Sequence, residues 1–169
     1  MGPRTGKRRF PRQRPSADEE RFRLSDSTCT ALQLANFWQD IPTDYAKGRI
    51  YLPQDEMRRF GVSEETIASR VATPEFRAML RFEVDFTRSL FEKGLALIGM
   101  VRRDLALDLE LFSSGGLEIL RAIERQDYDV LAFRPTLSNR TKFKLALRAA
   151  AGKVLPFSRL GLQSRRKTA

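Results

Sequence analysis

The sequence predicts an all-α fold, and three observations carry this prediction. Apolar residues recur every three or four positions over long stretches, as they do on one face of an α-helix. No stretch alternates between apolar and polar residues with the period of two that marks a half-buried β-strand. Residues that start or stop helices bound most of the periodic stretches. With 169 residues, the chain is long enough for one domain with a hydrophobic core.

The chain is expected to begin with a disordered segment. Residues 1–18 are rich in Arg, Pro and Gly and have almost no apolar pattern. We therefore assign residues 1–20 to a disordered basic leader and place the start of the helical pattern at Arg21. Ser25 or Ser27 is a candidate N-cap, because a serine hydroxyl can accept a hydrogen bond from a free backbone N–H at a helix start.

This first helix is expected to end near Tyr45. Gly48 is a helix stop, and Pro53 prevents any continuation. Pro42 lies inside the predicted helix, where it removes one backbone hydrogen bond and is expected to kink the helix near Trp38.

Further helices are expected along the rest of the chain, at about Gln54–Phe60, Glu64–Arg70, Pro74–Met100, Arg103–Phe112, Leu117–Gln126 and Asn139–Ala151. Thr73-Pro74-Glu75 is a strong start signal, since it combines an N-cap, a first-turn proline and an acid near the positive end of the helix dipole. Ser113-Ser114-Gly115-Gly116 is interpreted as a break between two helices, because it lacks the spacing of a phosphate-binding loop.

The net charge of +10 is concentrated at the two ends of the chain. Residues 1–15 carry six basic groups and residues 130–169 carry ten, and neither range contains an acidic residue. Residues 16–129 therefore have a net charge of −6. An acidic middle argues against nucleic acid bound along a whole face, and we predict no nucleic-acid partner.

The composition limits the chemistry. The chain has no His, which excludes Ser-His-Asp and Cys-His catalysis and disfavours zinc and haem sites. A bound metal is expected to be Mg²⁺, Mn²⁺ or Ca²⁺, held by carboxylate and amide oxygens. The single cysteine, Cys29, excludes an internal disulfide and is expected to pack as a small apolar residue.

The sequence also indicates a cellular location. Its longest apolar run, around residues 95–101, is far shorter than the roughly 20 residues of a membrane-spanning helix. No apolar segment follows the basic N-terminus, as it would in a secretory signal. We therefore expect a cytoplasmic protein.

The most informative stretch is ALQLANFWQDIPTD, residues 31–44. Its apolar residues would wrap most of a helix, so we expect this helix to be buried nearly all round. Four polar residues nevertheless fall at steps of three, four and four, and form one line along a helix face: Gln33, Asn36, Asp40 and Asp44. We call these four residues the polar stripe.

The two acids of the polar stripe need a compensating partner. Two carboxylates one helical turn apart repel each other if both are ionised and desolvated. A divalent cation would compensate them, because two carboxylates and an amide supply part of the octahedral shell of Mg²⁺, which water and phosphate oxygens complete. Alternatively, Asp40 and Asp44 lie on a solvated face or pair with Lys47 and Arg49.

An ordered set of motif residues extends beyond the stripe. The pattern Q-x-x-N-x-x-x-D-x-x-x-D is followed by G-R-I-Y-L-P, which ends at Pro53. This combination resembles the second aspartate-rich motif of the squalene/phytoene synthase family, and N-F-W-Q-D with G-R-I-Y-L-P is most similar to the bacterial hydroxysqualene synthase branch of hopanoid biosynthesis. A weaker likeness runs through residues 116–120 and 127–131. The resemblance covers residues 21–137 and implies part of a terpenoid synthase helical bundle lacking its N-terminal half.

The resemblance assigns roles to polar side chains. Asn36, Asp40 and Asp44 would hold Mg²⁺ that bridges to the diphosphate of an isoprenoid substrate. Gln33 would lie beside them as a substrate-binding residue. Arg49 would contact the departing diphosphate, because a permanently charged, forked donor suits phosphate oxygens.

The resemblance also assigns roles to aromatic side chains. Tyr51 and Tyr128 would be catalytic residues that line the cavity and offer a hydroxyl and an aromatic face to a carbocation. We assign Phe37 and Trp38 to the core, where aromatic residues of this spacing usually lie.

The implied chemistry is ionisation of a diphosphate in a dry apolar cavity. In the branch most resembled, presqualene diphosphate loses diphosphate and water captures the cation, which gives hydroxysqualene. Family members carry an earlier aspartate-rich motif in an N-terminal half that is missing from this sequence. We therefore expect this chain alone to have little or no activity, either as a fragment or as one half of a split gene, in which case a separate N-terminal half would be its partner.

A non-enzymatic helical module is the alternative function. Residues 138–169 are expected to form a basic amphipathic helix and tail. Basic and apolar residues alternate through residues 139–154, which would suit peripheral contact with an anionic membrane at its inner face, or with another partner. An enzyme acting on lipids would use the same feature. Nucleic-acid binding through the two basic ends is a third, less favoured class.

Overall fold

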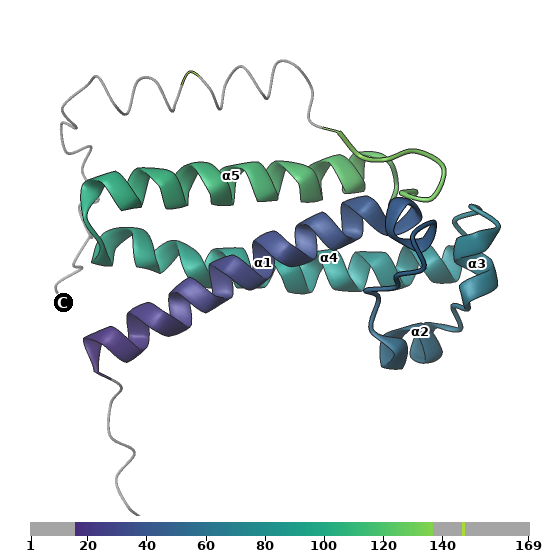
Figure 1. Ribbon diagram of the computed structural model, residues 1–169, viewed down its shortest axis with the longest axis horizontal. Coiled ribbons are helices and arrows are strands. Elements are labelled where there is room, and N and C mark those ends of the chain that lie inside the picture. The colour runs from purple at the N-terminus through teal and green to yellow at the C-terminus, as the bar shows by residue number, and fades with distance from the viewer. Residues whose placement is uncertain (1–15, 137–146, 148–169) are drawn as a thin grey trace, which may run out of the picture.

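The computed structural model describes residues 16–136 and residue 147. Within these residues every regular element is a helix: α1 Ala17–Tyr45, α2 Gln54–Phe60, α3 Glu64–Ala68, α4 Pro74–Gly94, the 3₁₀ helix η1 Leu95–Met100, and α5 Arg103–Arg125 (Figure 1). The predicted all-α class is confirmed. The helix predicted at Asn139–Ala151 lies outside the described residues except for Leu147, and so do the first 15 residues of the predicted leader.

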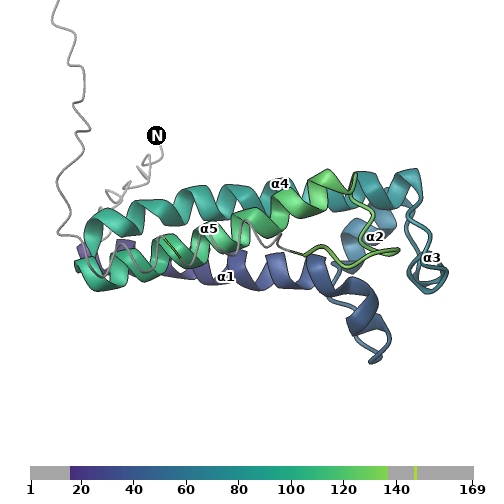
Figure 2. The same cartoon turned by 90° about the horizontal axis from the view of Figure 1, so that it is seen from above.

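The three long helices α1, α4 and α5 run side by side and enclose the core (Figures 1 and 2). Trp38 of α1, Phe76 and Phe91 of α4, and Leu120 and Ile123 of α5 are fully buried there. The short helices α2 and α3 lie at the end of the bundle where α1 ends. None of the helices in the described part of the chain is long and apolar enough to cross a membrane.

Helix α1 starts earlier than the sequence indicated. Ser16 accepts a hydrogen bond from the backbone N–H of Glu19, and the Glu19 side chain accepts one from the backbone N–H of Ser16, which is a complete capping box. The prediction of a cap at Ser25 or Ser27 is therefore wrong, because Ser27 is buried inside the helix and bonds the carbonyl of Arg23.

The middle of α1 is held to α4 by a buried polar contact. The indole N–H of Trp38 donates to the Thr87 hydroxyl at 2.8 Å, and this hydroxyl donates to the Glu83 carbonyl at 2.7 Å. The predicted core position of Trp38 is confirmed. Pro42 lies inside α1 without ending it. Cys29 is exposed, so its predicted packing role is wrong.

The predicted break at residues 113–116 is also wrong, since α5 runs through it without interruption. Gly116 is buried against the ring of Phe91 in α4, and a Cβ at this position would overlap that ring. The glycine therefore lets two helices approach closely. Gly115, beside it, has no described atom within 4 Å of the place where a Cβ would lie.

The remaining boundaries follow the sequence closely. Helix α2 has the predicted bounds and ends at Gly61, whose φ of 71° is left-handed. Helix α3 ends two residues before the predicted Arg70. Thr73 caps α4 by accepting from the backbone N–H of Phe76, and the last predicted turns of this helix, up to Met100, form η1 instead.

Candidate functional site

The polar stripe lies on the outward face of α1. The buried residues of this helix, among them Leu24, Ala31, Ala35 and Trp38, occupy the opposite face. Gln33 and Asn36 are exposed, and Asp40 and Asp44 are half-buried. The four side chains therefore share one face as predicted, but the expectation that α1 is buried nearly all round is wrong for the described part of the chain.

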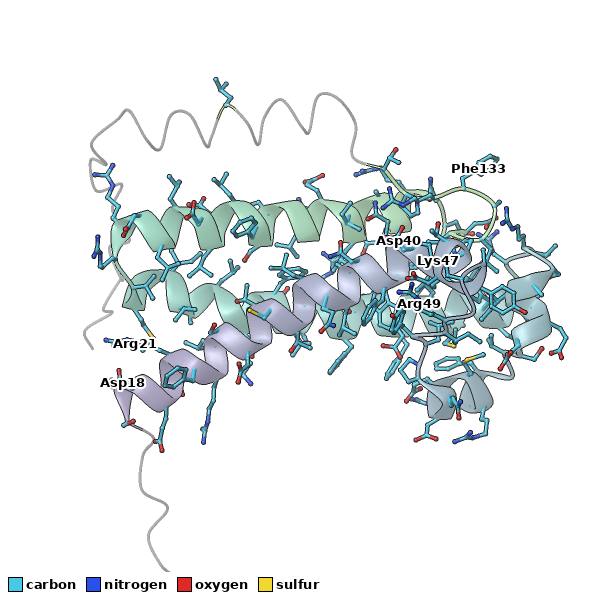
Figure 3. The ribbon with its side chains drawn as sticks, in the orientation of Figure 1. Asp18, Arg21, Asp40, Lys47, Arg49 and Phe133 are labelled. Carbon is cyan, nitrogen blue, oxygen red and sulfur yellow. The ribbon has the colours of Figure 1, made fainter. Side chains whose placement is uncertain are left out.

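A tight turn at the end of α1 brings the following segment back beside the stripe. The backbone carbonyl of Asp44 accepts hydrogen bonds from the N–H groups of Lys47 and Arg49, both at 2.9 Å. Gly48 lies between them with φ 71°, a conformation that glycine adopts without strain. The predicted stop at Gly48 is confirmed, and the turn brings Arg49 back beside Asp44. Asp40, Lys47 and Arg49 all lie toward the same end of the bundle (Figure 3).

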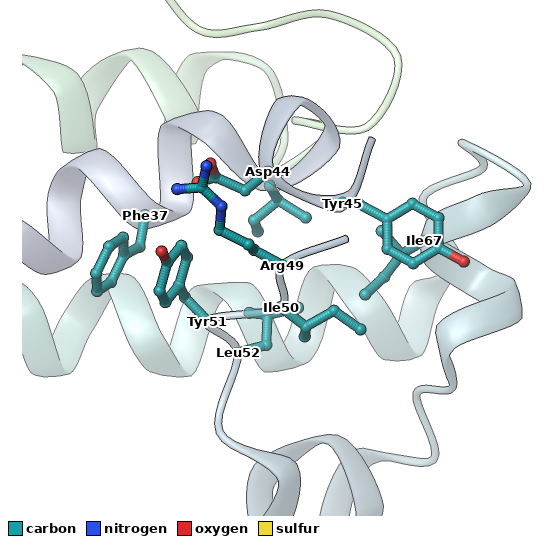
Figure 4. Close-up of a pocket in the computed structure, with 9 residues that line it drawn as sticks. Phe37, Asp44, Tyr45, Arg49, Ile50, Tyr51, Leu52 and Ile67 are labelled. Carbon is teal, nitrogen blue, oxygen red and sulfur yellow. The ribbon is translucent and has the colours of Figure 1, made fainter. Parts of the chain in front are cut away.

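Asp44, Arg49 and Tyr51 meet at a small hollow. Its walls come from the end of α1, the segment that follows it, and α3: Phe37, Ile41, Asp44, Tyr45, Arg49, Ile50, Tyr51, Leu52 and Ile67 (Figure 4). The rings of Phe37 and Tyr51 are stacked, with centroids 4.0 Å apart and planes 5° from parallel. The hollow therefore combines an aromatic wall, a carboxylate and a guanidinium.

The charges at this hollow interact. Hydrogen bonding to the Tyr51 side chain, and to a smaller extent the negative charge of Asp44, raises the pKa of Arg49 above its ordinary value. The guanidinium points toward the Asp44 carboxylate and lies beside the Tyr51 hydroxyl (Figure 4). Arg49 is exposed, so it remains a charged donor that a ligand in solution can contact.

Asp40 has a different partner. Its Oδ1 accepts a hydrogen bond from Nε of Arg134 at 2.5 Å, and its Oδ2 accepts one from Nη2 of the same residue at 3.2 Å. The neighbouring Gln39 donates to the backbone carbonyl of Pro135 at 2.5 Å. Pairing with Lys47 or Arg49 was the alternative explanation of the stripe. Asp40 instead forms its ion pair with Arg134.

Tyr128 does not line this hollow. It follows α5 in a turn where both Asp127 and Tyr128 have positive φ, 50° and 60°. Its ring lies under the guanidinium of Arg81 at 5.0 Å. Burial, followed by the negative charge of Glu124, raises the pKa of the Tyr128 hydroxyl. The structure thus brings Tyr51 to the polar stripe and places Tyr128 against α4.

The turn that holds Tyr128 is fixed by Arg77 near the start of α4. Arg77 donates to the backbone carbonyl and the carboxylate of Asp127, and to the carboxylate of Asp129 at 3.1 Å. Asp129 in turn accepts from the backbone N–H of Ala132 at 3.1 Å. These bonds explain how a strained turn persists, because several partners hold it at once.

The donor set of the stripe fits a hard cation only in part. Asp40, Asp44 and Asn36 offer oxygen atoms on adjacent turns of one helix face. Residues 16–136 and 147 contain no group of three His, Cys, Asp or Glu side chains that could hold a metal ion. The two carboxylates and one amide of the stripe could still form part of a Mg²⁺ site, because Mg²⁺ is commonly bound through one or two carboxylates, and water and substrate phosphates complete its shell.

Sequence reasoning missed two residues of the site. Phe37 packs against the core, to which we assigned it, but it is half-buried and also stacks on Tyr51 at the hollow. Its position four residues after Gln33 and seven before Asp44 places it on the same side of the helix as the stripe. This spacing is the sequence feature that could have assigned Phe37 to the site. No spacing rule connects Asp40 with Arg134, which lies 94 residues away.

The fold and the site together describe one class of protein. It is an all-α domain in which an oxygen-rich helix face lies beside an arginine and an aromatic-lined hollow. Residues 10–141 match the model of the squalene/phytoene synthase family. The chain belongs to this family, and the resemblance seen in the sequence is confirmed.

Individual relatives agree with this assignment. The chain is 35% identical over 109 residues to the 15-cis-phytoene synthase of Synechococcus elongatus, which covers 63% of this chain and 35% of that protein. It is 35% identical over 127 residues to phytoene synthase 1 of Zea mays, which covers 74% of this chain and 30% of that protein. The chain thus spans about a third of the length of these curated relatives.

A solved structure is also similar. The crystal structure of squalene synthase HpnC from Alicyclobacillus acidocaldarius is 48% identical, with a TM-score of 0.64. The match covers 66% of this chain and 42% of that chain. The two proteins therefore share a helical fold over about two thirds of this chain.

Proposed function

We propose that this chain provides one side of an isoprenoid diphosphate site that works with Mg²⁺. The observation that carries the proposal is the meeting of Asp44, Arg49 and Tyr51 at one hollow, one helical turn from Asp40. By similarity, the proposed reaction is conversion of presqualene diphosphate to hydroxysqualene, with release of diphosphate, in hopanoid or triterpenoid biosynthesis. The 48% identity to a protein described as squalene synthase HpnC supports this choice within the family.

The polar residues would act on the diphosphate. Asn36, Asp40 and Asp44 would hold the metal through their side-chain oxygens, with Gln33 beside them on the same face. When bound, Mg²⁺ would neutralise the negative charge that develops on the leaving diphosphate. Arg49 would donate to phosphate oxygens, since its planar fork matches them and its charge persists at every physiological pH.

The aromatic residues would act on the hydrocarbon. Phe37 and Tyr51 stack into one wall of the hollow and present π faces that attract a nearby cation. Tyr51 also interacts with Arg49, so it would orient the donor to the diphosphate. Tyr128 lies outside this hollow, and a catalytic role for it would need a part of the cavity that the described residues do not form.

The first test is binding of inorganic diphosphate in the presence and absence of Mg²⁺, measured by titration calorimetry. Asp44→Asn should weaken Mg²⁺-dependent binding by at least about tenfold, because loss of even an indirect metal partner has an effect of that size. Asp26→Asn is the matched control, since Asp26 is an exposed aspartate of the same helix outside the stripe. Equal affinities for the two variants would contradict the proposed site.

The second test is turnover. We expect the purified 169-residue chain to convert presqualene diphosphate slowly or not at all, because it provides only one side of the site. Addition of the part of a homologous synthase that lies outside the match should raise the rate, and hydroxysqualene should be the product. Rapid conversion by the chain alone would contradict this division of the site.

The alternative function, a helical module acting through its basic ends, concerns residues outside the described ranges. Nothing in residues 16–136 favours it over the isoprenoid site, and sedimentation with anionic vesicles across a salt series would test it.

A further inference from the structure

Arg134 pairs with Asp40, one of the carboxylates that the proposed function assigns to a metal ion. Both oxygens of Asp40 accept a hydrogen bond from this one guanidinium, in the two-pronged arrangement that gives Arg–carboxylate pairs their geometric specificity. The interaction with Asp40 raises the pKa of Arg134 above its ordinary value. A cation is therefore already present at one of the two acids of the stripe.

The segment that carries Arg134 is anchored on both sides. Before it, Val130 and Leu131 are buried in the core. After it, Pro135 is buried and its carbonyl accepts the hydrogen bond of Gln39, which precedes Asp40 in α1. The fold thus delivers the guanidinium to Asp40 as part of a docked segment.

Asp44 lacks such a partner. No ion pair of its carboxylate is found within the described part of the chain, and the exposed Arg49, which shares the hollow with it, interacts with it only weakly. The two acids of the stripe therefore differ: Asp44 is open to a ligand, while Asp40 is engaged.

A divalent ion and a guanidinium would compete for Asp40. Two positive charges a few ångströms apart repel, and this repulsion is stronger at a partly buried site than in bulk water. The Asp40 side chain is 28% exposed and that of Arg134 is 52% exposed, so the guanidinium has a path into solvent. A pair of this exposure is weak enough for a doubly charged ion to displace.

We propose that Arg134 is a resident counter-cation of Asp40, which a divalent ion must displace, and that this ion pair sets the metal affinity of the site. The proposal rests on the proposed function, since it takes Asp40 as a metal ligand. In the absence of metal, the pair keeps one of the two neighbouring carboxylates neutralised. When the metal binds, the Arg134 side chain turns away and both carboxylates become available.

The first experiment measures Mn²⁺ affinity of the full chain by electron paramagnetic resonance. Arg134→Gln should bind Mn²⁺ about two- to fivefold more tightly than the wild type, which is the range that loss of a partly exposed ion pair allows. Arg121→Gln is the matched control, because Arg121 also forms an ion pair, with Glu118, and is also 52% exposed. Its affinity should equal that of the wild type.

A double-mutant cycle with Asp40→Asn shows whether the effect passes through this pair. Asp40→Asn should weaken Mn²⁺ binding, and Arg134→Gln should have no further effect in its presence. As an independent readout, the Nε–H resonance of Arg134 in ¹⁵N spectra should shift when Mg²⁺ is added to the wild type, and should stay unchanged in Asp40→Asn. Thermal melting of each variant verifies that it is folded.

The outcomes separate this inference from the proposed function. If Asp40→Asn weakens Mn²⁺ binding but Arg134→Gln leaves it unchanged or weakens it, the counter-cation role is wrong and the metal site stands. If Mn²⁺ binding is the same in the wild type, Asp40→Asn and Asp44→Asn, the metal site is wrong, and the counter-cation role is wrong with it.

Discussion

The end of α1 and the place where α1, α4 and α5 cross are built in opposite ways. At the crossing, Trp38, Phe91 and Gly116 are buried. Helices α4 and α5 approach closely there, because Gly116 has no side chain and the ring of Phe91 packs against it. At the end of α1, the outward face carries polar side chains that are exposed or half-buried, and one of them, Asp40, has its partner in a distant segment. The crossing maximises packing, whereas the end of α1 leaves donors and acceptors accessible.

This difference suggests a division of labour. Substitutions at the crossing should change the free energy of unfolding, because close-packed interiors tolerate little change in volume. Substitutions at the end of α1 should change ligand binding and leave stability nearly unaltered, since exposed polar groups contribute little to folding. The largest effects on the free energy of unfolding are therefore expected at the crossing, away from the proposed ligand site.

The strongest test of the crossing is Gly116→Ala. The added methyl group would overlap the ring of Phe91, so either the ring or one of the helices must move. We expect a loss of about 2–3 kcal/mol in the free energy of unfolding, as for other overpacked cores. Denaturant unfolding followed by circular dichroism measures it.

Gly115→Ala provides the matched control in the same helix. No described atom lies within 4 Å of the new methyl group, and alanine favours a helix over glycine by about 0.5–1 kcal/mol. This variant should therefore be slightly more stable than the wild type. If both alanines had the same effect, the close approach of α4 and α5 at Gly116 would be refuted.

Glu83 is an exception within the packed region and offers a pH-dependent test. This acid of α4 is 4% exposed, and burial, followed by the negative charge of Glu56 in α2, raises its pKa to about 7 from an ordinary value of 4.5. The folded protein therefore binds more protons than the unfolded chain between about pH 4.5 and 7. Its stability should fall as the pH rises through that window.

Glu83→Gln removes this penalty. At pH 8 the variant should be about 3 kcal/mol more stable than the wild type, and at pH 4.5 the two should be nearly equal, because a protonated carboxyl and an amide have similar shapes. Glu92→Gln, an exposed acid of the same helix, should show no such pH dependence. A constant difference across the pH range would mean that Glu83 titrates normally.

The sequence predicted those features that depend on local patterns. The end of α1, the bounds of α2 and the cap at Thr73 follow from single residues and short spacings. The break at residues 113–116 was predicted wrongly, because a glycine that stops a helix and a glycine that admits a ring from another helix look the same in one dimension. Tertiary packing decided between them.

The site shows the same limit. The line of the polar stripe and its closeness to Arg49 and Tyr51 follow from helical spacing and one short turn. The pairing of Asp40 with Arg134 depends on where the chain returns after α5. That return is fixed by contacts of Arg77 and Gln39, and neither lies near Arg134 in the sequence.

Gly48 gives the smallest expected effect and links the two regions, since it is a glycine at the site whose role is conformational. Its φ of 71° strains any residue with a Cβ, while no described atom lies within 4 Å of the added methyl group. Gly48→Ala should therefore lower the free energy of unfolding by about 1 kcal/mol through backbone strain alone. Gly48→Asn should lower it less, because asparagine tolerates the left-handed region. Thermal unfolding of the three proteins measures the order. A loss for alanine as large as that at Gly116 would mean that the turn is packed like the crossing, and the contrast between the two regions would no longer hold.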